Sequence, residues 1–348
     1  MKAVVYRSKQ AVVEDRPVPK LRDDYVLVKV VAVALNPTDW KHVAGEMPAE
    51  GGLIGCDFSG IVEEVGSAVT KPWSKGDKIL GVAHGGNFVQ PDDGAFAEYI
   101  VAKGDVQIKK PDNLSFEQAA TVPLGATTVG QGLYQKALKL NLPTDPIKEK
   151  TYVLIYAGST ATGALAIQYA TLSGYSVITT CSPRNFGYVK SLGATEAFDY
   201  NDPEAARKIR ELTGNKLKYA WDTISEGPSA QFCADALSSE KGAGCRYGAI
   251  LPVKFPRDDV ESTSTLMYTV FGEAFDFRGT QIPSVPDDFE FAKKFMGITE
   301  QLLAEGKLKP HAEKVGKGGL QGVLQGLEDL KTGKVSGSKL VYKVEETS

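Results

Sequence analysis

Hydrophobic and polar positions in the middle of the chain predict a strand, a helix and a second strand, in that order. Tyr152–Ala157 is a short run of β-branched and aromatic residues, which is typical of a buried parallel strand. Gly158 follows, and apolar periodicity then predicts a helix that ends near Leu172. Ser173-Gly174 stops this helix, and Tyr175–Thr180 predicts another buried strand. We therefore expect a βαβ unit whose helix begins at the carboxyl end of a strand.

The remaining pattern predicts a β-rich N-terminal part and an alternating α/β part. Residues 1 to about 110 are mostly short apolar or alternating runs between turns. A short helix is expected over 112–120, and a longer helix from Leu124 to about Leu138. The later expected elements are helices at 188–192, 204–212, 229–237 and 287–305, and strands at 197–200, 219–223, 245–251 and 339–343.

The turn between the first strand and the helix of the βαβ unit predicts a phosphate site. Backbone N–H groups and the helix dipole favour a bound phosphate there, so a dinucleotide is the expected ligand. The glycine pattern G-x-G-x-x-G is incomplete, because Ala157 and Thr160 stand near two of its positions while Gly158 and Gly163 are well placed. The residues expected to contact the cofactor at this turn are Ser159, Thr160, Ala161 and Thr162.

The loop after the second strand indicates which dinucleotide is bound. A cofactor with a free 2′-hydroxyl usually meets an acidic residue at this point, and the loop from Cys181 to Asn185 contains none. An arginine offers forked, charged donors that suit a 2′-phosphate, and Lys190 adds positive charge. We therefore expect NADPH rather than NADH, although an arginine in a solvated polar loop is the alternative. The expected contacts are Ser182, Pro183, Arg184, Asn185 and Lys190.

Composition and charge limit the remaining possibilities. A chain of 348 residues is about right for two domains, and 42% hydrophobic and 24% charged residues are typical of a soluble globular protein. The net charge of −3 gives no general basic field for nucleic acid. The chain has no apolar run of about 18 residues to span a membrane, and its start lacks the apolar region of a signal peptide, so we expect a cytoplasmic protein. The four cysteines, at positions 56, 181, 233 and 245, are never spaced C-x-x-C, and we expect small buried residues.

Six motifs in a fixed order resemble the medium-chain dehydrogenase/reductase superfamily over essentially the whole chain. They are NPTDWK, GCDFSGIVEEVG, GDKI, GAFAEYI, AATVPLGATTVG and the βαβ unit. The resemblance implies an α/β fold with a doubly wound parallel Rossmann sheet. It implies a chaperonin-10-like (GroES-like) domain from residues 1–125 and 285–348, and a Rossmann NADPH-binding domain at 126–284. The last strand is then expected to rejoin the first domain.

The same resemblance allows a test for zinc. Zinc-dependent members carry a cysteine, a Gly-His-Glu motif and a further ligand, whereas this chain has Gly55-Cys56-Asp57 at the motif. His42, Cys56, Asp57 and His84 do not reproduce a zinc pattern, and the chain has only three histidines. We therefore expect no metal, as in the zinc-free quinone-reductase and enoyl-reductase branch.

A closer resemblance is to the trans-acting enoyl reductases of fungal polyketide synthases, such as those of the lovastatin type. GSTATG, CSPRNF, AFDY, TVFGEAFDF and KVSGSKLVYK carry it. It implies NADPH-dependent reduction of the α,β-unsaturated thioester of a carrier-protein-bound intermediate in secondary-metabolite biosynthesis. The implied partner is a polyketide synthase, with the reductase itself a monomer. The alternatives are a zinc-free NADPH quinone or small-enone reductase and a non-catalytic NADPH-binding protein.

The family resemblance also implies the site residues. Lys41 is the charged candidate to donate to an enolate, deliver a proton or hold a cofactor phosphate, and Thr128 is the neutral donor. The alternatives are a surface lysine and a packed helix start, and Tyr6, Tyr99 and Tyr156 remain further proton sources. The implied substrate contacts are Thr128, Val129, Gly130, Gln131, Gly132, Leu133, Tyr134 and Gln135. The implied additional cofactor contacts are Pro37, Thr38, Asp39, Trp40, Tyr200 (or a core aromatic), Ile250, Leu251, Thr269, Val270, Phe271, Gly272, Glu273, Gly337 and Ser338.

Overall fold

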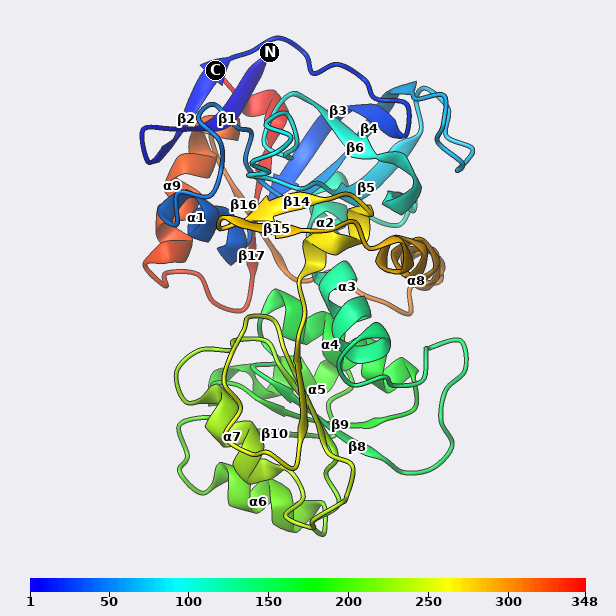
Figure 1. Cartoon of the computed structure of the whole chain (residues 1–348), viewed down its shortest axis with the longest axis vertical. Coiled ribbons are helices and arrows are strands. Elements are labelled where there is room, and N and C mark those ends of the chain that lie inside the picture. Colours follow the sequence, from blue (N-terminus) through cyan, green and yellow to red (C-terminus); the bar gives the residue numbers. More distant parts are fainter. The chain divides into compact units, whose positions relative to one another are not determined.

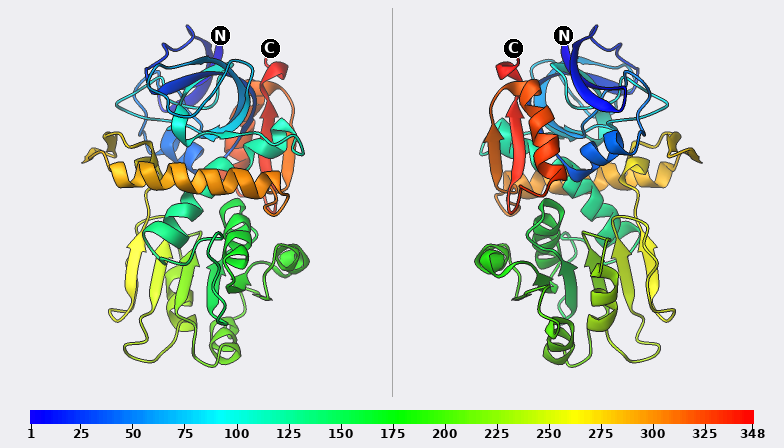
Figure 2. Two further views of the ribbon diagram at one scale, coloured as in Figure 1. Left: turned by 90° about the vertical axis from the view of Figure 1, so that its right-hand side faces the viewer. Right: turned by 90° about the vertical axis from the view of Figure 1, so that its left-hand side faces the viewer.

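The computed structural model describes all residues, 1–348, and divides the chain into two compact units (Figure 1). The first unit consists of Met1–Leu124 and Tyr268–Ser348, and the second unit is Gly125–Met267. Both ends of the chain lie close together on the first unit (Figure 2).

The chain returns to the first unit at Tyr268, whereas the resemblance led us to expect the return at residue 285. The return is earlier because the segment 268–277 packs inside the first unit. The ring of Tyr268 stacks on His84 with 4.3 Å between centroids, and Phe275 meets His84 edge-on at 4.9 Å. The entry into the second unit, after Leu124, is one residue earlier than expected.

A mostly antiparallel sheet forms the centre of the first unit. Its neighbours run in the order β16-β17-β3-β4-β5-β7, and β6 also pairs with β3. The strands are β3 (Tyr25–Ala34), β4 (Asp57–Val65), β5 (Lys78–Val82), β6 (Tyr99–Lys103), β7 (Ile108–Lys109), β16 (Glu313–Gly316) and β17 (Lys339–Lys343). Because β17 pairs with β3, the expectation that the last strand rejoins the first domain is confirmed.

Two hairpins, four α-helices and three short 3₁₀ turns complete the first unit. The hairpins are β1 (Lys2–Arg7) with β2 (Gln10–Asp15), and β14 (Phe275–Phe277) with β15 (Thr280–Ile282). The α-helices are α1 (Pro37–Ala44), α2 (Phe116–Ala120), α8 (Pro286–Ala304) and α9 (Gly319–Lys331). The 3₁₀ turns are η1 (Gly104–Val106), η4 (Met267–Phe271) and η5 (Val344–Glu346).

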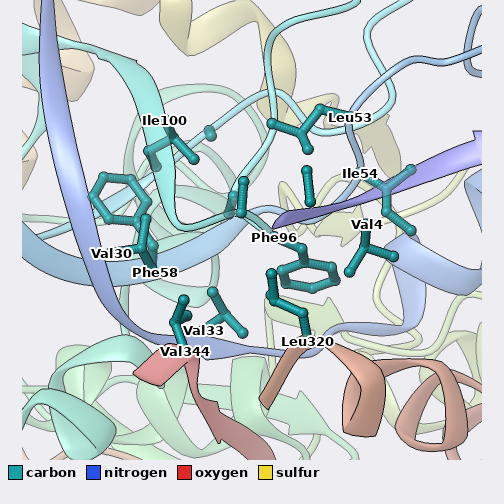
Figure 3. Close-up of a cluster of buried hydrophobic side chains, with 14 of the residues drawn as sticks. Val4, Val30, Val33, Leu53, Ile54, Phe58, Phe96, Ile100, Leu320 and Val344 are labelled. Carbon is teal, nitrogen blue, oxygen red and sulfur yellow. The ribbon is translucent and has the colours of Figure 1, made fainter. Parts of the chain in front are cut away.

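Aliphatic and aromatic side chains from distant segments form the core of the first unit (Figure 3). Val4, Phe58 and Phe96 are completely buried, and each side chain of this size contributes about 1.5–3 kcal/mol when removed from water. Gly55 passes over this core with a left-handed φ of 94°, and a Cβ there would lie 2.3 Å from the Phe96 ring. Glycine is therefore required at this position.

The second unit is a parallel sheet of six strands in the order β10-β9-β8-β11-β12-β13. The strands are β8 (Tyr152–Tyr156), β9 (Ser176–Thr180), β10 (Glu196–Phe198), β11 (Tyr219–Asp222), β12 (Arg246–Ala249) and β13 (Glu261–Ser264). The connecting helices are α4 (Ala161–Leu172), α5 (Phe186–Ser191), α6 (Ala205–Leu212) and α7 (Ser229–Ala236), with the 3₁₀ turn η3 (Pro183–Asn185) before α5. This order is that of a doubly wound Rossmann sheet, so the expected fold class is confirmed.

The prediction of a long α-helix from Leu124 to Leu138 is correct only for its first half. It is α-helical as α3 (Pro123–Val129) and then widens into a π-helix, η2 (Gly130–Gln135). The widened turn brings Gly132 against Trp221 so closely that a Cβ would lie 2.1 Å from the indole. Single-turn π-helices inside α-helices often mark functional sites.

All four cysteines are free and buried, as expected. They lie on different segments and are 0–3% exposed. None of the helices combines the length and the apolar character that crossing a membrane requires.

Candidate active site

The turn between β8 and α4 has a left-handed residue where the glycine pattern is incomplete. Ala157 has a φ of 62°, a conformation that costs a residue with a Cβ about 1 kcal/mol. Its carbonyl accepts hydrogen bonds from the Thr160 hydroxyl at 2.9 Å and the Thr160 backbone N–H at 3.1 Å. Its N–H donates to the Thr180 hydroxyl at 3.0 Å. These bonds hold Ala157 in the geometry that a glycine would adopt freely.

Thr160 is the N-cap of α4. Its hydroxyl oxygen accepts the N–H of Gly163 at 3.0 Å, which satisfies one of the free donors at the start of the helix. The hydroxyl of Thr223 lies 3.1 Å from that of Thr160 and donates to the Tyr156 carbonyl at 2.8 Å. Thr223 was missed by sequence analysis; it follows β11, the neighbour of β8, and only the strand order identifies it.

Both glycines of this turn are required by close packing. A Cβ on Gly158 would lie 2.1 Å from the Thr179 hydroxyl oxygen, and a Cβ on Gly163 would lie 2.4 Å from the Ala157 carbonyl oxygen. The predicted contacts Ser159, Thr160, Ala161 and Thr162 are partly exposed at the start of α4. The turn thus presents backbone N–H groups at the carboxyl end of β8, as a phosphate site requires.

The loop after β9 brings two predicted cofactor contacts together. The hydroxyls of Ser182 and Tyr200 are 3.2 Å apart, and Tyr200 is 42% exposed, so the alternative of a core aromatic is wrong. Arg184 is exposed on η3 with Pro183 before it and Asn185 after it.

Lys190 has a partner that sequence analysis did not foresee. Its ammonium group lies 2.6 Å from the Glu196 carboxylate, and both side chains are partly exposed. Ile250 and Leu251 directly follow β12 and are partly buried, and the Ile250 N–H donates to the Ser225 hydroxyl at 3.0 Å.

The predicted substrate segment in the second unit is mostly buried. Thr128 and Gln135 are partly buried, while Val129, Gly130, Gln131, Gly132, Leu133 and Tyr134 are buried. The Tyr134 hydroxyl lies 2.9 Å from the Ser173 hydroxyl, and burial raises the Tyr134 pKa. Its phenol is therefore used within the second unit.

In the first unit, the start of α1 is fixed by carboxylates. The Asp39 carboxylate accepts the Asn36 N–H at 2.7 Å, and burial raises the pKa of Asp39 to about 7. The Asp57 carboxylate accepts the Asn36 side-chain amide at 2.8 Å and the Leu124 N–H at 2.7 Å, and it pairs with the buried Lys339 ammonium. The Asp39 carboxylate therefore stabilises the start of α1. The prediction of Asp39 as a cofactor contact did not include this structural role.

Thr38 joins the two predicted cofactor segments of the first unit. Its hydroxyl lies 2.8 Å from the Tyr268 hydroxyl and 3.2 Å from Nε2 of His42. The Tyr268 hydroxyl is also 3.2 Å from the same His42 nitrogen. Sequence analysis named Thr38 and Thr269 but missed Tyr268, because no local pattern relates residues more than 200 positions apart. It considered His42 only as a metal ligand, although His42 follows Thr38 by one turn of α1.

Most side chains after Tyr268 face into the first unit. The Thr269 hydroxyl donates to Asp288, Val270 is buried, and the Phe271 ring stacks on His84 at 5.7 Å. The Glu273 carboxylate accepts the Tyr25 hydroxyl and pairs with Lys103, each at 2.8 Å. Gly272, in the same segment, has a left-handed φ of 67°.

The other predicted residues of the first unit lie at its partly exposed surface. Pro37 is exposed, and Trp40 and Lys41 are partly exposed, with the Lys41 ammonium 5.8 Å from the Trp40 ring centre. Gly337 and Ser338 precede β17 and are partly exposed.

The candidate zinc ligands do not fit a metal site. Nδ1 of His42 is 3.0 Å from the Gly85 carbonyl oxygen, His84 is stacked between aromatic rings, and Asp57 is bound to Lys339. No three His, Cys, Asp or Glu side chains are placed to hold one ion.

Comparisons with known proteins agree with this architecture. Residues 22–112 match the model of the alcohol dehydrogenase GroES-like domain, and residues 161–267 match that of the zinc-binding dehydrogenase domain. Among solved structures, a quinone oxidoreductase of Coxiella burnetii has a TM-score of 0.72 at 28% identity, covering 99% of both chains. The JamJ enoyl reductase has a TM-score of 0.74 at 21% identity, covering 98% of this chain and 99% of its own, which supports the fold alone.

Sequence relatives are more similar. A trans-enoyl reductase of Cochliobolus carbonum is 56% identical over 84% of this chain and 98% of its own length. One of Alternaria alternata is 48% identical over 99% of both chains, and one of Aspergillus sclerotiorum is 47% identical over 96% of this chain and 97% of its own. The chain therefore belongs to the trans-enoyl reductases, within the medium-chain dehydrogenase/reductase family of oxidoreductases that bind a nicotinamide cofactor.

Proposed function

We propose that this protein is a trans-acting, NADPH-dependent enoyl reductase that reduces the α,β-unsaturated thioester of a polyketide intermediate bound to a carrier protein. The observation that supports it best is the dinucleotide turn between β8 and α4, on a chain whose relatives are named trans-enoyl reductases. The proposed partner is a polyketide synthase that presents the tethered substrate.

The preference for NADPH rests on Arg184. The loop around it lacks a carboxylate. Ser182 follows the end of β9 and Tyr200 follows the end of β10, and their two hydroxyls are 3.2 Å apart. Because Lys190 is paired with Glu196, Arg184 is the residue expected to recognise the 2′-phosphate. The turn residues 159–162 would hold the pyrophosphate through backbone N–H groups.

In the proposed reaction the cofactor supplies the hydride, and the protein supplies hydrogen bonds and one proton. NADPH, when bound, supplies a hydride to the β-carbon of the conjugated alkene. Lys41 and Thr128 are proposed to donate hydrogen bonds to the thioester oxygen as negative charge develops there. Lys41 is also proposed to transfer a proton to the α-carbon and to regain one from solvent.

Replacement of Lys41 tests this assignment. We expect Lys41→Ala to lower kcat by about 100-fold, the usual range for loss of a general acid, with little change in NADPH affinity. Turnover with a saturating enoyl thioester and a separate cofactor titration would measure both. An unchanged kcat would remove Lys41 from the mechanism, and a loss of NADPH affinity alone would assign it to the cofactor phosphate.

The edge strand β13, which carries one charged side chain, supports the proposal of a monomer. Its Glu261 pairs with Lys139 at 3.3 Å and with Arg246 at 3.0 Å, and charged side chains on an exposed edge oppose strand pairing with another chain. Light scattering of the purified protein would test this, since a mass near twice 37.4 kDa would contradict it. A cytoplasmic location remains a prediction.

A quinone or small-enone reductase is the second candidate, favoured by the similarity to the Coxiella burnetii quinone oxidoreductase. NADPH oxidation with crotonyl and longer 2-methyl-enoyl pantetheine thioesters, and with a simple quinone, separates the two. Activity that rises with chain length and is absent with quinone supports the proposal. Activity with quinone alone contradicts it, and tight NADPH binding without turnover, even on carrier-protein-bound thioesters, would favour a non-catalytic protein.

A further inference from the structure

Three polar groups inside the first unit form a closed hydrogen-bonded set, which we call the hydroxyl triangle: the hydroxyls of Thr38 and Tyr268 and Nε2 of His42. The hydroxyls are 2.8 Å apart, and each is 3.2 Å from Nε2. Tyr268 and His42 are 5% exposed, whereas Thr38 is partly exposed. The triangle therefore joins two buried residues and one partly exposed residue.

The hydrogen positions in the triangle follow from the hydrogen bond that Nδ1 of His42 makes outside the triangle. Nδ1 is 3.0 Å from the Gly85 carbonyl oxygen, which can only accept, so Nδ1 carries a hydrogen. Burial lowers the pKa of His42 to about 4, and the ring is neutral near pH 7. Nε2 is then an acceptor, and one of the two hydroxyls must donate to it.

The second hydroxyl hydrogen has the other hydroxyl as its nearest partner, because the two oxygens are 2.8 Å apart and the Cys56 thiol is 3.8 Å from the Tyr268 oxygen. Either Tyr268 donates to Nε2 and Thr38 donates to Tyr268, or Thr38 donates to Nε2 and Tyr268 donates to Thr38. In both arrangements no hydroxyl hydrogen is left to point outward, while the Thr38 oxygen keeps at least one lone pair. The exposed corner of the triangle is thus a hydrogen-bond acceptor.

Aromatic packing makes this arrangement rigid. His84 stacks on the Tyr268 ring at 4.3 Å with an interplanar angle of 13°, and Phe275 meets His84 edge-on at 4.9 Å. Phe277 lies 6.3 Å from the Tyr268 ring. The phenol oxygen is held in place by these rings, and the Cys56 thiol, 3.8 Å away, is its remaining polar neighbour.

We propose that Tyr268 and His42 are positioning residues that fix Thr38 as a hydrogen-bond acceptor for an N–H or O–H group of the nicotinamide half of the cofactor. The inference rests on the proposed function, since it takes NADPH as the ligand and Pro37–Trp40 as part of its site. The two donors available on that half of the cofactor are the carboxamide N–H and the ribose hydroxyls. A bound ligand that covers the Thr38 oxygen without donating to it would leave this acceptor without a hydrogen bond, which costs more than one hydrogen bond gains. A fixed acceptor therefore selects a ligand that donates.

The test is binding of NADPH and of its 3-acetylpyridine analogue, which lacks the carboxamide N–H, measured by fluorescence without turnover. Thr38→Val keeps the side-chain shape and removes the acceptor, and Tyr268→Phe keeps the aromatic stack and removes one hydroxyl. We expect Thr38→Val to weaken NADPH about fivefold, the loss of one hydrogen bond. We expect Tyr268→Phe to weaken it less, and the double variant to equal Thr38→Val, because Tyr268 acts through Thr38.

The analogue distinguishes the two donors. If Thr38→Val weakens NADPH but not the analogue, Thr38 accepts from the carboxamide; if it weakens both equally, it accepts from a ribose hydroxyl. Either result supports the proposal. Tyr175→Phe is the control, since it removes another buried phenol, one that accepts the Asn141 N–H at 3.1 Å, and should leave both affinities unchanged.

The assignment would be overturned if Thr38→Val bound NADPH as tightly as the wild type. It would also be overturned if the loss of affinity in the double variant equalled the product of the losses in the two single variants. NADPH binding is measured without substrate. A negative result here can therefore be distinguished from a negative result in the enoyl thioester assay, which tests the proposed function. Thermal unfolding of each variant identifies any that simply fail to fold.

Discussion

The turn between β8 and α4 in the second unit and the hydroxyl triangle of the first unit are each held by hydrogen bonds, but between different kinds of partner. In the turn, Ala157, Thr160 and Gly163 bond to one another within seven residues of chain, with support from Thr180 and Thr223. In the triangle, Tyr268 meets Thr38 and His42 across separations of 230 and 226 residues. The turn depends mainly on local backbone geometry, whereas the triangle exists only once the chain has returned to the first unit.

This difference predicts which property each substitution should affect. Changes in the turn are expected to act on cofactor binding and on α4, and changes at the long-range contacts of the first unit are expected to act on the stability of that unit as a whole.

The largest effect is expected at the buried ion pair beside α1. Lys339→Met leaves the fully buried Asp57 carboxylate without its cation, and breaking such a pair typically costs about 3–5 kcal/mol. Urea unfolding at pH 7 would measure it, and Lys334→Met, at an exposed ammonium 3.4 Å from Asp329, is the matched control with a small expected effect. A loss below about 1 kcal/mol would show that the long-range contacts are not the main support of this region.

A steric change in the turn should be the next largest. Gly158→Ala places a methyl group 2.1 Å from the Thr179 hydroxyl oxygen, and we expect a loss of about 2 kcal/mol in unfolding free energy together with weaker NADPH binding. Gly187→Ala is the control, because a Cβ there meets nothing within 4 Å. Equal stability of the two variants would mean that the turn adjusts more easily than its packing indicates.

A smaller effect is expected from charge at the loop after β9. Arg184→Ala should weaken NADPH about tenfold and NADH little, because it removes a charge-assisted bond to the 2′-phosphate. Lys190→Ala should weaken NADPH less than Arg184→Ala, since Lys190 pairs with Glu196. Comparison of both dissociation constants for both variants checks the assignment, and equal weakening of NADPH and NADH by Arg184→Ala would contradict it.

The smallest expected effect is at Ala157. Ala157→Gly relieves a left-handed φ of 62° but adds freedom to the unfolded chain, so the two terms of about 1 kcal/mol nearly cancel. We expect unchanged NADPH affinity and an unfolding free energy within about 1 kcal/mol of the original. A clear loss of affinity would show that the methyl group itself contacts the ligand.

The second unit was largely predictable from sequence because its strands carry local signals. Tyr152–Tyr156 and Ser176–Thr180 differ from their predicted ranges by one residue each, since buried parallel strands are short apolar runs between turns. The stop of α4 at Leu172 was also correct. The π-helix at Gly130–Gln135, in which Gly132 packs against the distant Trp221, has no local signature and was not predicted.

The candidate site was predictable where residues are close in sequence and not where tertiary contact decides. The βαβ pattern alone placed Ser159–Thr162 at the turn between β8 and α4, and their contact with a cofactor stays a prediction. Tyr268 has no local signature, and its partners on α1 are set by the fold of the first unit. The pairing of Lys190 with Glu196 was missed although the two residues are close in sequence, because it depends on the turn that joins α5 to β10.

The burial of all four native thiols has a practical consequence for measuring motion. Thiol-reactive probes need an accessible sulfur, and Cys56, Cys181, Cys233 and Cys245 are each no more than 3% exposed. New cysteines at exposed Glu64 in the first unit and Lys216 in the second would therefore be labelled selectively, with the native residues left in place. Energy transfer between two such dyes would report how the distance between the units changes as NADPH and an enoyl thioester bind.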